Sequence, residues 1–114
     1  MARNMSFMLT TEQVRDGTKT VTRRTGWAFL KRGDILNACV KCQGLKKGEK
    51  IEVIRQIKVT HVGLEQLFSI AKSDVISEGF SGMTTSEFVK MFIKANKGCT
   101  AGTMVNRIEF EYVN

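Results

Sequence analysis

Apolar and polar residues alternate with the two-residue period of a β-strand in segments toward both ends of this chain. Apolar residues with helical spacing lie mainly in one block between 64 and 96, and a brief helix is also expected after Thr10. The clearest strand pattern covers 105–113, where apolar and charged residues occupy opposite faces. The apolar set is Ile108, Phe110 and Tyr112, and the charged set is Arg107, Glu109 and Glu111. Because the helical block interrupts the strands instead of alternating with them, this order excludes a doubly wound α/β fold. It predicts an α+β domain with a small mixed β-barrel.

The patterns predict about five strands and three or four short helices. Strands are expected over 5–9, 19–24, 35–42, 50–62 and 105–113, and helices after Thr10 and over 64–70, 74–77 and 84–96. The strands expected at 35–42 and 50–62 should pair as a β-hairpin, and the loop that joins them is basic. Two capping boxes are predicted, Thr10 with Gln13 and Thr84 with Glu87. Ser73 should cap the helix at 74–77, and Gly17 should end the first helix.

The chain has 114 residues, of which 42% are hydrophobic, and it contains no proline. Nothing in it resembles a linker, so we expect one domain over 1–114. No apolar run approaches the ~20 residues of a membrane span, so no membrane partner is expected. The first residues, MARNMSF, lack the apolar stretch of a signal peptide, which predicts a cytoplasmic location. No oligomeric state is predicted from these patterns.

The positive charge is concentrated in the first half of the chain. Residues 1–58 carry 13 Lys and Arg against 5 Asp and Glu, whereas residues 59–114 carry 5 against 6. An excess confined to one half can form a patch that attracts polyanions through counterion release. The alternative is a basic, solvated surface without a partner.

The short β-prone segment after Gly17 carries an amine, a hydroxyl and a guanidinium, on Lys19, Thr22 and Arg24. Residues two apart on a strand share a face, so Thr22 and Arg24 should point the same way. Lys19 lies an odd number of positions from both residues, so on a regular strand it would point to the opposite face, and it needs a turn or bulge to reach the face that Thr22 and Arg24 share. Together, with Arg23 as a further candidate, these groups suit an anionic ligand or a reacting acyl group. The alternative is a solvated basic edge strand, where lysines discourage pairing with other chains.

Residues 17–24, GTKTVTRR, match the pattern G-x-K-x-x-T-x-R in full. In this the chain resembles the ASCH domain, a branch of the PUA-like β-barrels. The likeness extends to the Gly-Asp turn that opens a strand at 33–36, to 74–80 with the helix at 84–92 after it, and to the final strand at 107–110. It therefore covers nearly the whole chain.

The resemblance implies a barrel with a cleft near its first helix. ASCH domains are proposed to bind RNA or nucleotides, some small members are amidohydrolases that deacetylate acetylcytidine, and ribonuclease activity has been attributed to others. The catalytic Lys, Thr and Glu of the amidohydrolases map to Lys19, Thr22 and Glu78, and the arginine of the motif maps to Arg24. The segment after Glu78 is a few residues longer here than in those amidohydrolases.

Two functions follow from this resemblance. The first is a module that binds RNA, a nucleotide or a modified nucleoside in a basic cleft. The second is a nucleoside amidohydrolase with Thr22 as nucleophile, Lys19 as base and Glu78 as acid and base. A lysine acts as a base only if burial or a nearby cation keeps it partly neutral. If Lys19 and Glu78 instead form an ion pair, the site is better suited to binding. Ribonuclease action is weakened by the absence of a well-placed histidine.

The CxxC of Cys39 and Cys42, with His61 and Cys99 elsewhere, is the candidate for a metal site. Only one compact ligand pair exists, and on a strand Cys39 and Cys42 would project to opposite faces. Buried structural cysteines are therefore favoured, and no metal or other cofactor is predicted. His61 is interpreted as structural.

Further ligand contacts are predicted outside the motif. Lys46 and Lys47 lie in the basic hairpin loop and could grip a phosphate backbone, or they could only solubilise its tip. Trp27 could stack on a base, although such a residue more often belongs to the core. The stripe of Phe88, Met91 and Phe92 on the last helix is interpreted as core.

Overall fold

A single mixed sheet of five strands, in the order β1-β3-β4-β5-β2, forms the body of the protein in the computed structural model, which describes residues 2–42 and 44–113. The strands are β1 (Arg3–Ser6), β2 (Val21–Arg24), β3 (Ile35–Cys39), β4 (Val53–Gln66) and β5 (Met104–Tyr112). The α-helices are α1 (Thr11–Arg15), α2 (Lys72–Ser77) and α3 (Thr85–Ala95), and single 3-10 turns cover Met8–Thr10 and Leu67–Ser69. β1 pairs with β3 in parallel, and the other pairs are antiparallel.

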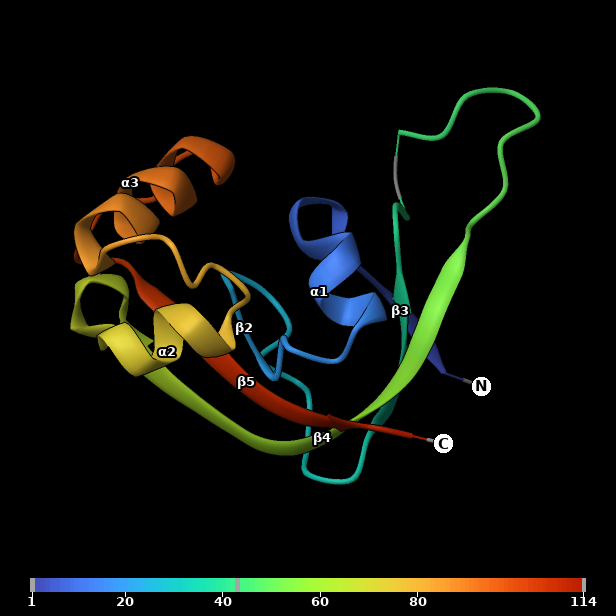
Figure 1. Ribbon diagram of the computed structural model, residues 1–114, viewed down its shortest axis with the longest axis horizontal. Helices are drawn as coiled ribbons and strands as arrows, with labels where there is room; N and C mark the ends of the chain where they lie inside the picture. The colour runs from blue at the N-terminus through green and yellow to red at the C-terminus, as the bar shows by residue number, and fades with distance from the viewer. Residues whose placement is uncertain (1, 43, 114) are drawn as a thin grey trace.

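The sheet curls because its longest strand serves two partners in succession. The first part of β4 pairs with β3 and the second part with β5, with irregular register at Val59/His61 on β4 and at Ala38/Cys39 on β3. Such irregularities bend a strand and increase its twist. Figure 1 shows the curled sheet. The edge strands β1 and β2 approach each other, since Arg24 Nη2 donates to the carbonyl oxygen of Ser6 at 2.7 Å across the gap between them. The predicted α+β fold with a small mixed barrel is confirmed.

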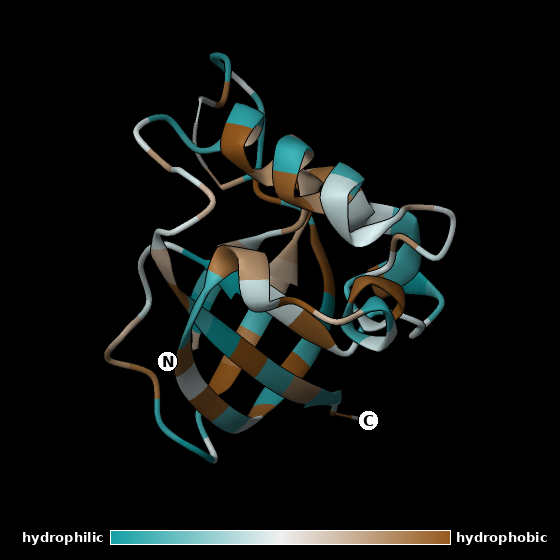
Figure 2. Cartoon of the chain, turned by 90° about the vertical axis from the view of Figure 1, so that its left-hand side faces the viewer, coloured by the Kyte–Doolittle hydropathy of each residue, from teal (hydrophilic) through white to brown (hydrophobic). Residues whose placement is uncertain are grey.

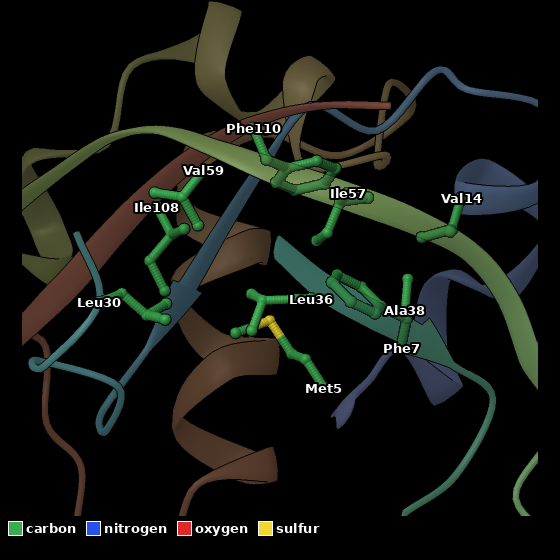
Figure 3. Close-up of a cluster of buried hydrophobic side chains, with 10 residues drawn as sticks. All are labelled: Met5, Phe7, Val14, Leu30, Leu36, Ala38, Ile57, Val59, Ile108 and Phe110. Atoms are coloured by element: carbon green, nitrogen blue, oxygen red, sulfur yellow. The ribbon is translucent and has the colours of Figure 1, made fainter. Parts of the chain in front are cut away.

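Two apolar clusters lie on either side of this gap. The first fills the inside of the curled sheet (Figure 3) and consists of Met5, Phe7, Val14, Leu30, Leu36, Ala38, Ile57, Val59, Ile108 and Phe110. The second packs α2 and α3 against the far ends of β4 and β5 and consists of Leu67, Ile70, Val75, Phe88, Phe92, Cys99 and Val105. Apolar and polar bands alternate along the strands in Figure 2, as expected for a sheet with one buried face. Full burial of one such large side chain contributes about 1.5–3 kcal/mol.

The helix ends agree with the sequence at two of the predicted positions. Thr84 Oγ1 accepts from the backbone N–H of Glu87 at 3.1 Å, and Glu87 Oε1 accepts from the N–H of Thr84 at 2.9 Å, which confirms this capping box. Gly17 has φ of +84° immediately after α1, a left-handed conformation that glycine adopts without strain. The helix predicted at 84–96 is α3.

Two predicted caps are wrong. Thr10 precedes α1, but its side chain makes no capping hydrogen bond, and the hydroxyl of Thr11 donates to the carbonyl oxygen of Phe7 at 3.0 Å. Ser73 lies inside α2, whose N-cap is Ala71. Thr10 therefore has the predicted N-cap position without the predicted capping hydrogen bonds, whereas Ser73 is not at the N-cap of its helix.

The helix predicted over 64–70 is also wrong. β4 continues to Gln66 and ends in a single 3-10 turn, because its pairing with β5 reaches Met104. Cross-strand pairing here overrides the helical spacing of the apolar residues. Three strands are shorter than expected: the first ends at Ser6, the second begins only at Val21, and the third ends at Cys39. No helix within the described residues is long and apolar enough to cross a membrane.

Candidate functional site

A pocket of about 220 Å³ lies at the gap between the edge strands, with the two apolar clusters on either side of it. Its floor is formed by polar side chains that arrive from two distant segments: Lys19, Thr22, Arg23 and Arg24 from the β2 region, and Glu78 from the end of α2. The end of β1 and the 3-10 turn after it form one wall, and α3 forms the other. The structure thus brings all four motif-derived residues, Lys19, Thr22, Arg24 and Glu78, to one cavity.

Lys19 and Glu78 form a buried ion pair. The Lys19 amine donates to Oε1 of Glu78 at 2.9 Å and to the carbonyl oxygen of the same residue at 2.6 Å. The side chains are only 3% and 4% exposed. The backbone of Lys19 is also fixed, because its carbonyl oxygen accepts a hydrogen bond from the Tyr112 hydroxyl at 2.6 Å. The amine therefore occupies one fixed position at the pocket floor.

Arg23 holds the second oxygen of the same carboxylate. Its Nη1 donates to Oε2 of Glu78 at 3.1 Å, while the rest of its guanidinium is bound by Glu65 and Asp74. Its side chain is 1% exposed. Lys19 lies in the segment before β2 and Arg23 lies on β2, so one short stretch of chain supplies both cations that bind the Glu78 carboxylate.

Asp74 connects this cluster to the surface. It accepts from Arg107 Nε at 2.6 Å and from Arg107 Nη2 at 3.1 Å, in addition to its contact with Arg23. The hydrogen bonds from Arg107, with further support from Arg23, lower the pKa of the Asp74 carboxyl to about 2. Asp74 is therefore ionised at neutral pH and helps to fix the guanidinium that orients Glu78.

Thr22 and Arg24 form the other pair in the pocket. They share a face of β2, as predicted, and Arg24 Nε donates to Thr22 Oγ1 at 3.0 Å. Because Thr22 accepts this bond, its own hydroxyl proton is left to donate elsewhere. Arg24 also lies 4.8 Å from the centre of the Phe7 ring, so the ring face supports the cation.

Burial shifts the acid-base behaviour of both cations on the floor. It lowers the pKa of the Lys19 amine, and the charges of Arg24 and Arg23 act in the same direction, against the opposing effect of Glu78. It also lowers the pKa of the Arg24 guanidinium to about 10, so Arg24 remains protonated at neutral pH. Both cations therefore hold their protons less tightly than usual.

The walls of the pocket are largely aromatic. Phe7 and Phe80 each place a ring centre 5.9 Å from the Lys19 amine, on opposite walls. Phe80 packs edge-on against Phe88, and Phe88 against Phe92 along α3. The apolar stripe of α3, which the sequence assigns to the core, therefore has a second role as a pocket wall.

The remaining predicted contacts lie elsewhere. Lys46 and Lys47 are in the exposed loop between β3 and β4, which projects at the end of the molecule away from α2 and α3 (Figure 1). Trp27 stacks on Phe29 with ring centres 5.5 Å apart and packs against the cluster inside the sheet. Neither segment contributes to the pocket lining, and their contact with a ligand stays a prediction.

The cysteines are placed differently from the prediction. β3 ends at Cys39, so Cys42 lies in the following loop and is free to turn back toward Cys39. Burial, with the neighbouring Cys42, raises the pKa of the Cys39 thiol to about 11. Cys39 is buried, as the sequence favours, and Cys42 is half-buried. Cys99 belongs to the cluster under α3, and His61 is exposed on β4 opposite Glu109.

Sequence reasoning missed three polar residues of the pocket wall, Ser6, Thr10 and Asn96. Thr10 is 4% exposed and was assigned to a helix cap. Asn96 ends α3 and donates from Nδ2 to the carbonyl oxygen of Phe92 at 2.9 Å. Nothing local to the β2 segment indicates that Lys19 and Arg23 share a carboxylate, or which one they share.

Comparisons with known proteins give a fold-level result. No family model matches the sequence, and no curated protein matches it either. Solved structures do match. Hypothetical protein PH0355 has 18% identity and a TM-score of 0.70, over 99% of this chain and 100% of that one. Protein EF3133 from Enterococcus faecalis V583, described under the family model DUF984, has 15% identity and a TM-score of 0.66, over 99% and 80%. An ASCH domain from Lactobacillus crispatus JV V101 has 12% identity and a TM-score of 0.61, over 96% and 78%.

Proposed function

Starting from the premise that this chain has the fold of an ASCH domain, we propose that it binds one nucleotide unit, free or exposed in RNA, in the pocket around Lys19, Thr22, Arg24 and Glu78. The observation that carries this proposal is the pairing of a cationic floor with aromatic walls in one cavity. Bases stack on aromatic rings, and phosphate or carbonyl oxygens accept from buried cations.

The size of the cavity favours a small ligand group. About 220 Å³ lies below the roughly 300–1,000 Å³ of pockets for drug-sized ligands. It offers room for a base or a nucleoside, and a longer strand would have to continue over the surface outside. The excess of Lys and Arg in residues 1–58 would then attract the rest of that strand.

Three of the floor residues, Lys19, Thr22 and Arg24, each have a donor to spare. An ammonium carries three N–H groups, and two of those on Lys19 are used by Glu78. Thr22 keeps its hydroxyl proton, and Arg24 has N–H groups beyond those that bind Thr22 and Ser6. Three converging donors suit the oxygen atoms of a carbonyl or phosphate. Glu78 acts in this proposal as the fixed partner that positions the Lys19 amine.

The test is a titration of three probes: cytidine 5′-monophosphate, acetylcytidine and a single-stranded RNA of about ten nucleotides. Arg24→Ala should weaken binding of the preferred probe by tenfold or more, since it removes a charge-assisted contact. Arg32→Ala is the matched control, because Arg32 is exposed and outside the pocket lining. If RNA is the ligand, affinity should also fall steeply with salt. Equal affinity in wild type and Arg24→Ala would contradict the proposal.

A second candidate, amidohydrolysis of an acylated nucleoside, is favoured by one observation: a hydroxyl positioned by Arg24 shares the pocket with a lysine whose pKa burial lowers. In this reaction Thr22 Oγ bonds to the acyl carbon and its proton passes to neutral Lys19. The C–N bond then breaks, the amine leaves with a proton from the site, and water hydrolyses the acyl-threonine to the free acid. Within the described residues, however, the hydrogen bonds of the Lys19 amine go to Glu78 and not to Thr22. We therefore place binding first.

Hydrolysis of acetylcytidine distinguishes the two candidates. Catalysis predicts turnover that Thr22→Val abolishes and that rises with pH on the alkaline side, as the Lys19 amine loses its proton. Binding alone predicts no turnover above the uncatalysed rate, with wild type and Thr22→Val indistinguishable. Ligand binding, measured by the titration described above, is then the remaining activity.

A further inference from the structure

The 3-10 turn before α1 presents one hydroxyl that the fold does not use. Thr10 is 4% exposed and lines the pocket. It occupies the N-cap position of α1, yet its side chain makes no capping hydrogen bond. The backbone N–H of Thr10 donates to the carbonyl oxygen of Phe7, and so does the hydroxyl of the neighbouring Thr11. A threonine at an N-cap normally accepts from the helix, and a buried hydroxyl normally has a partner.

The rotamer of Thr10 is set by its methyl group. Gly79, which directly follows Glu78, has φ of +100°, and a Cβ built there would lie 3.4 Å from Thr10 Cγ2. The methyl group thus packs on the backbone beside Glu78, and the hydroxyl occupies another staggered position. Because β-branched side chains have few χ1 choices, this contact holds the hydroxyl in one direction. Buried side-chain oxygens without a partner are absent from the described residues, so Thr10 Oγ1 keeps some access to solvent, and Thr10 is one of the residues that line the pocket.

We infer that Thr10 contacts the ligand directly and is a determinant of specificity, an inference that rests on the proposed function. Its hydroxyl can donate or accept, whereas the nearby floor residues Lys19, Thr22 and Arg24 offer donors. Thr10 therefore suits a ligand group that has hydrogen-bonding capacity of both kinds, such as the edge of a base or a sugar hydroxyl. The Thr10 hydroxyl is available for this role because it makes no capping hydrogen bond to α1.

The experiment compares Thr10→Val and Thr10→Ser with wild type, using the three probes named above. Valine keeps the methyl group that faces Gly79 and removes the hydroxyl, so we expect affinity for the preferred probe to fall about tenfold, with unbound Thr10→Val unfolding at a temperature no lower than wild type. Serine keeps the hydroxyl and should bind within about threefold of wild type. Thr25→Val, an exposed threonine beyond β2, is the control and should bind as wild type does.

Four results are decisive. Weakened binding in Thr10→Val with unchanged stability supports the inference. Unchanged binding in Thr10→Val, when Arg24→Ala still weakens it, overturns the role of Thr10 and leaves the proposed function standing. Loss of thermal stability in Thr10→Val assigns the hydroxyl a structural role and also overturns it. If wild type binds none of the three probes, the proposed function and this inference fall together.

Discussion

The amine of Lys19 lies 2.9 Å from Oε1 of Glu78, although the two residues are 59 positions apart in the sequence and both are almost completely buried. Burying an ion pair of this kind costs desolvation energy for both charged groups. The attraction between them offsets that cost only when their geometry is good and further hydrogen bonds satisfy both groups. Here the carbonyl oxygen of Glu78 and the guanidinium of Arg23 provide those bonds. The pair fixes the end of α2 to the segment before β2 and defines the floor of the pocket.

Removing one partner of this pair should be strongly destabilising. Lys19→Met leaves the Glu78 carboxylate with only Arg23, and we expect the free energy of unfolding to fall by about 3–5 kcal/mol. The double variant Lys19→Met/Glu78→Gln should recover a large part of this loss, because no lone charge remains buried. Urea unfolding of both variants measures the difference. Two independent, additive losses would mean that the residues do not interact.

Acid should weaken the protein through Asp74. The folded-state pKa of about 2 lies below the ordinary value of 3.8, so the folded protein binds this proton less readily than the unfolded chain. The resulting stabilisation, about 2 kcal/mol, is fully present above pH 4 and is lost as the pH falls from 4 toward 2. Urea unfolding over this range should show a steeper decline in wild type than in Asp74→Asn. Parallel declines would contradict the assignment.

Gly79 should be sensitive to substitution for two separable reasons. Its φ of +100° strains any side chain, and an added Cβ would lie 3.0 Å from Gln13 Cγ. Gly33 has a similar φ of +97° but open space around it. Gly33→Ala therefore measures the backbone strain alone, at about 1–2 kcal/mol, and Gly79→Ala should cost more. Thermal unfolding of the two variants is sufficient, and an equal cost would show that Gln13 moves aside freely.

The capping box of α3 should contribute about 1 kcal/mol. Thr84→Ala removes the acceptor for the Glu87 N–H and should lower the free energy of unfolding by that amount. Thr85→Ala is the matched control, since Thr85 is the first helical residue and its hydroxyl takes no part in the box. Because α3 forms one wall of the pocket, a weaker cap should also reduce ligand affinity slightly. No difference between the two variants would contradict the role of Thr84.

The sequence was a good guide where a local pattern coincides with a local contact. The two-residue spacing of Thr22 and Arg24 predicted a shared face, and they are hydrogen-bonded. The pattern Thr84 with Glu87 predicted a capping box that the structure contains. The fold class followed from the order of strands and helices, and the resemblance to the ASCH domain indicated the same barrel.

The failures lie where distant segments decide the outcome. The apolar spacing near Leu64 resembles a helix, but pairing with β5 extends β4 to Gln66. Arg23 was considered only as a possible ligand contact, because no local signal shows that Glu65, Asp74 and Glu78 converge on it. Thr10 has the local pattern of a cap, but its side chain makes no capping hydrogen bond and its methyl group lies beside Gly79. Such contacts depend on the tertiary structure, which one sequence pattern does not contain.

The most direct test of the account is to follow backbone amide resonances while the protein is titrated with its preferred probe. We predict saturable shifts at Thr10, Thr22, Arg24 and Gly79, with little change in the exposed loop at 44–50. Shifts confined to that loop, or a linear drift without saturation, would show that basic surface charge alone attracts the ligand. That result would contradict the central claim that the pocket around Lys19 and Glu78 is the binding site.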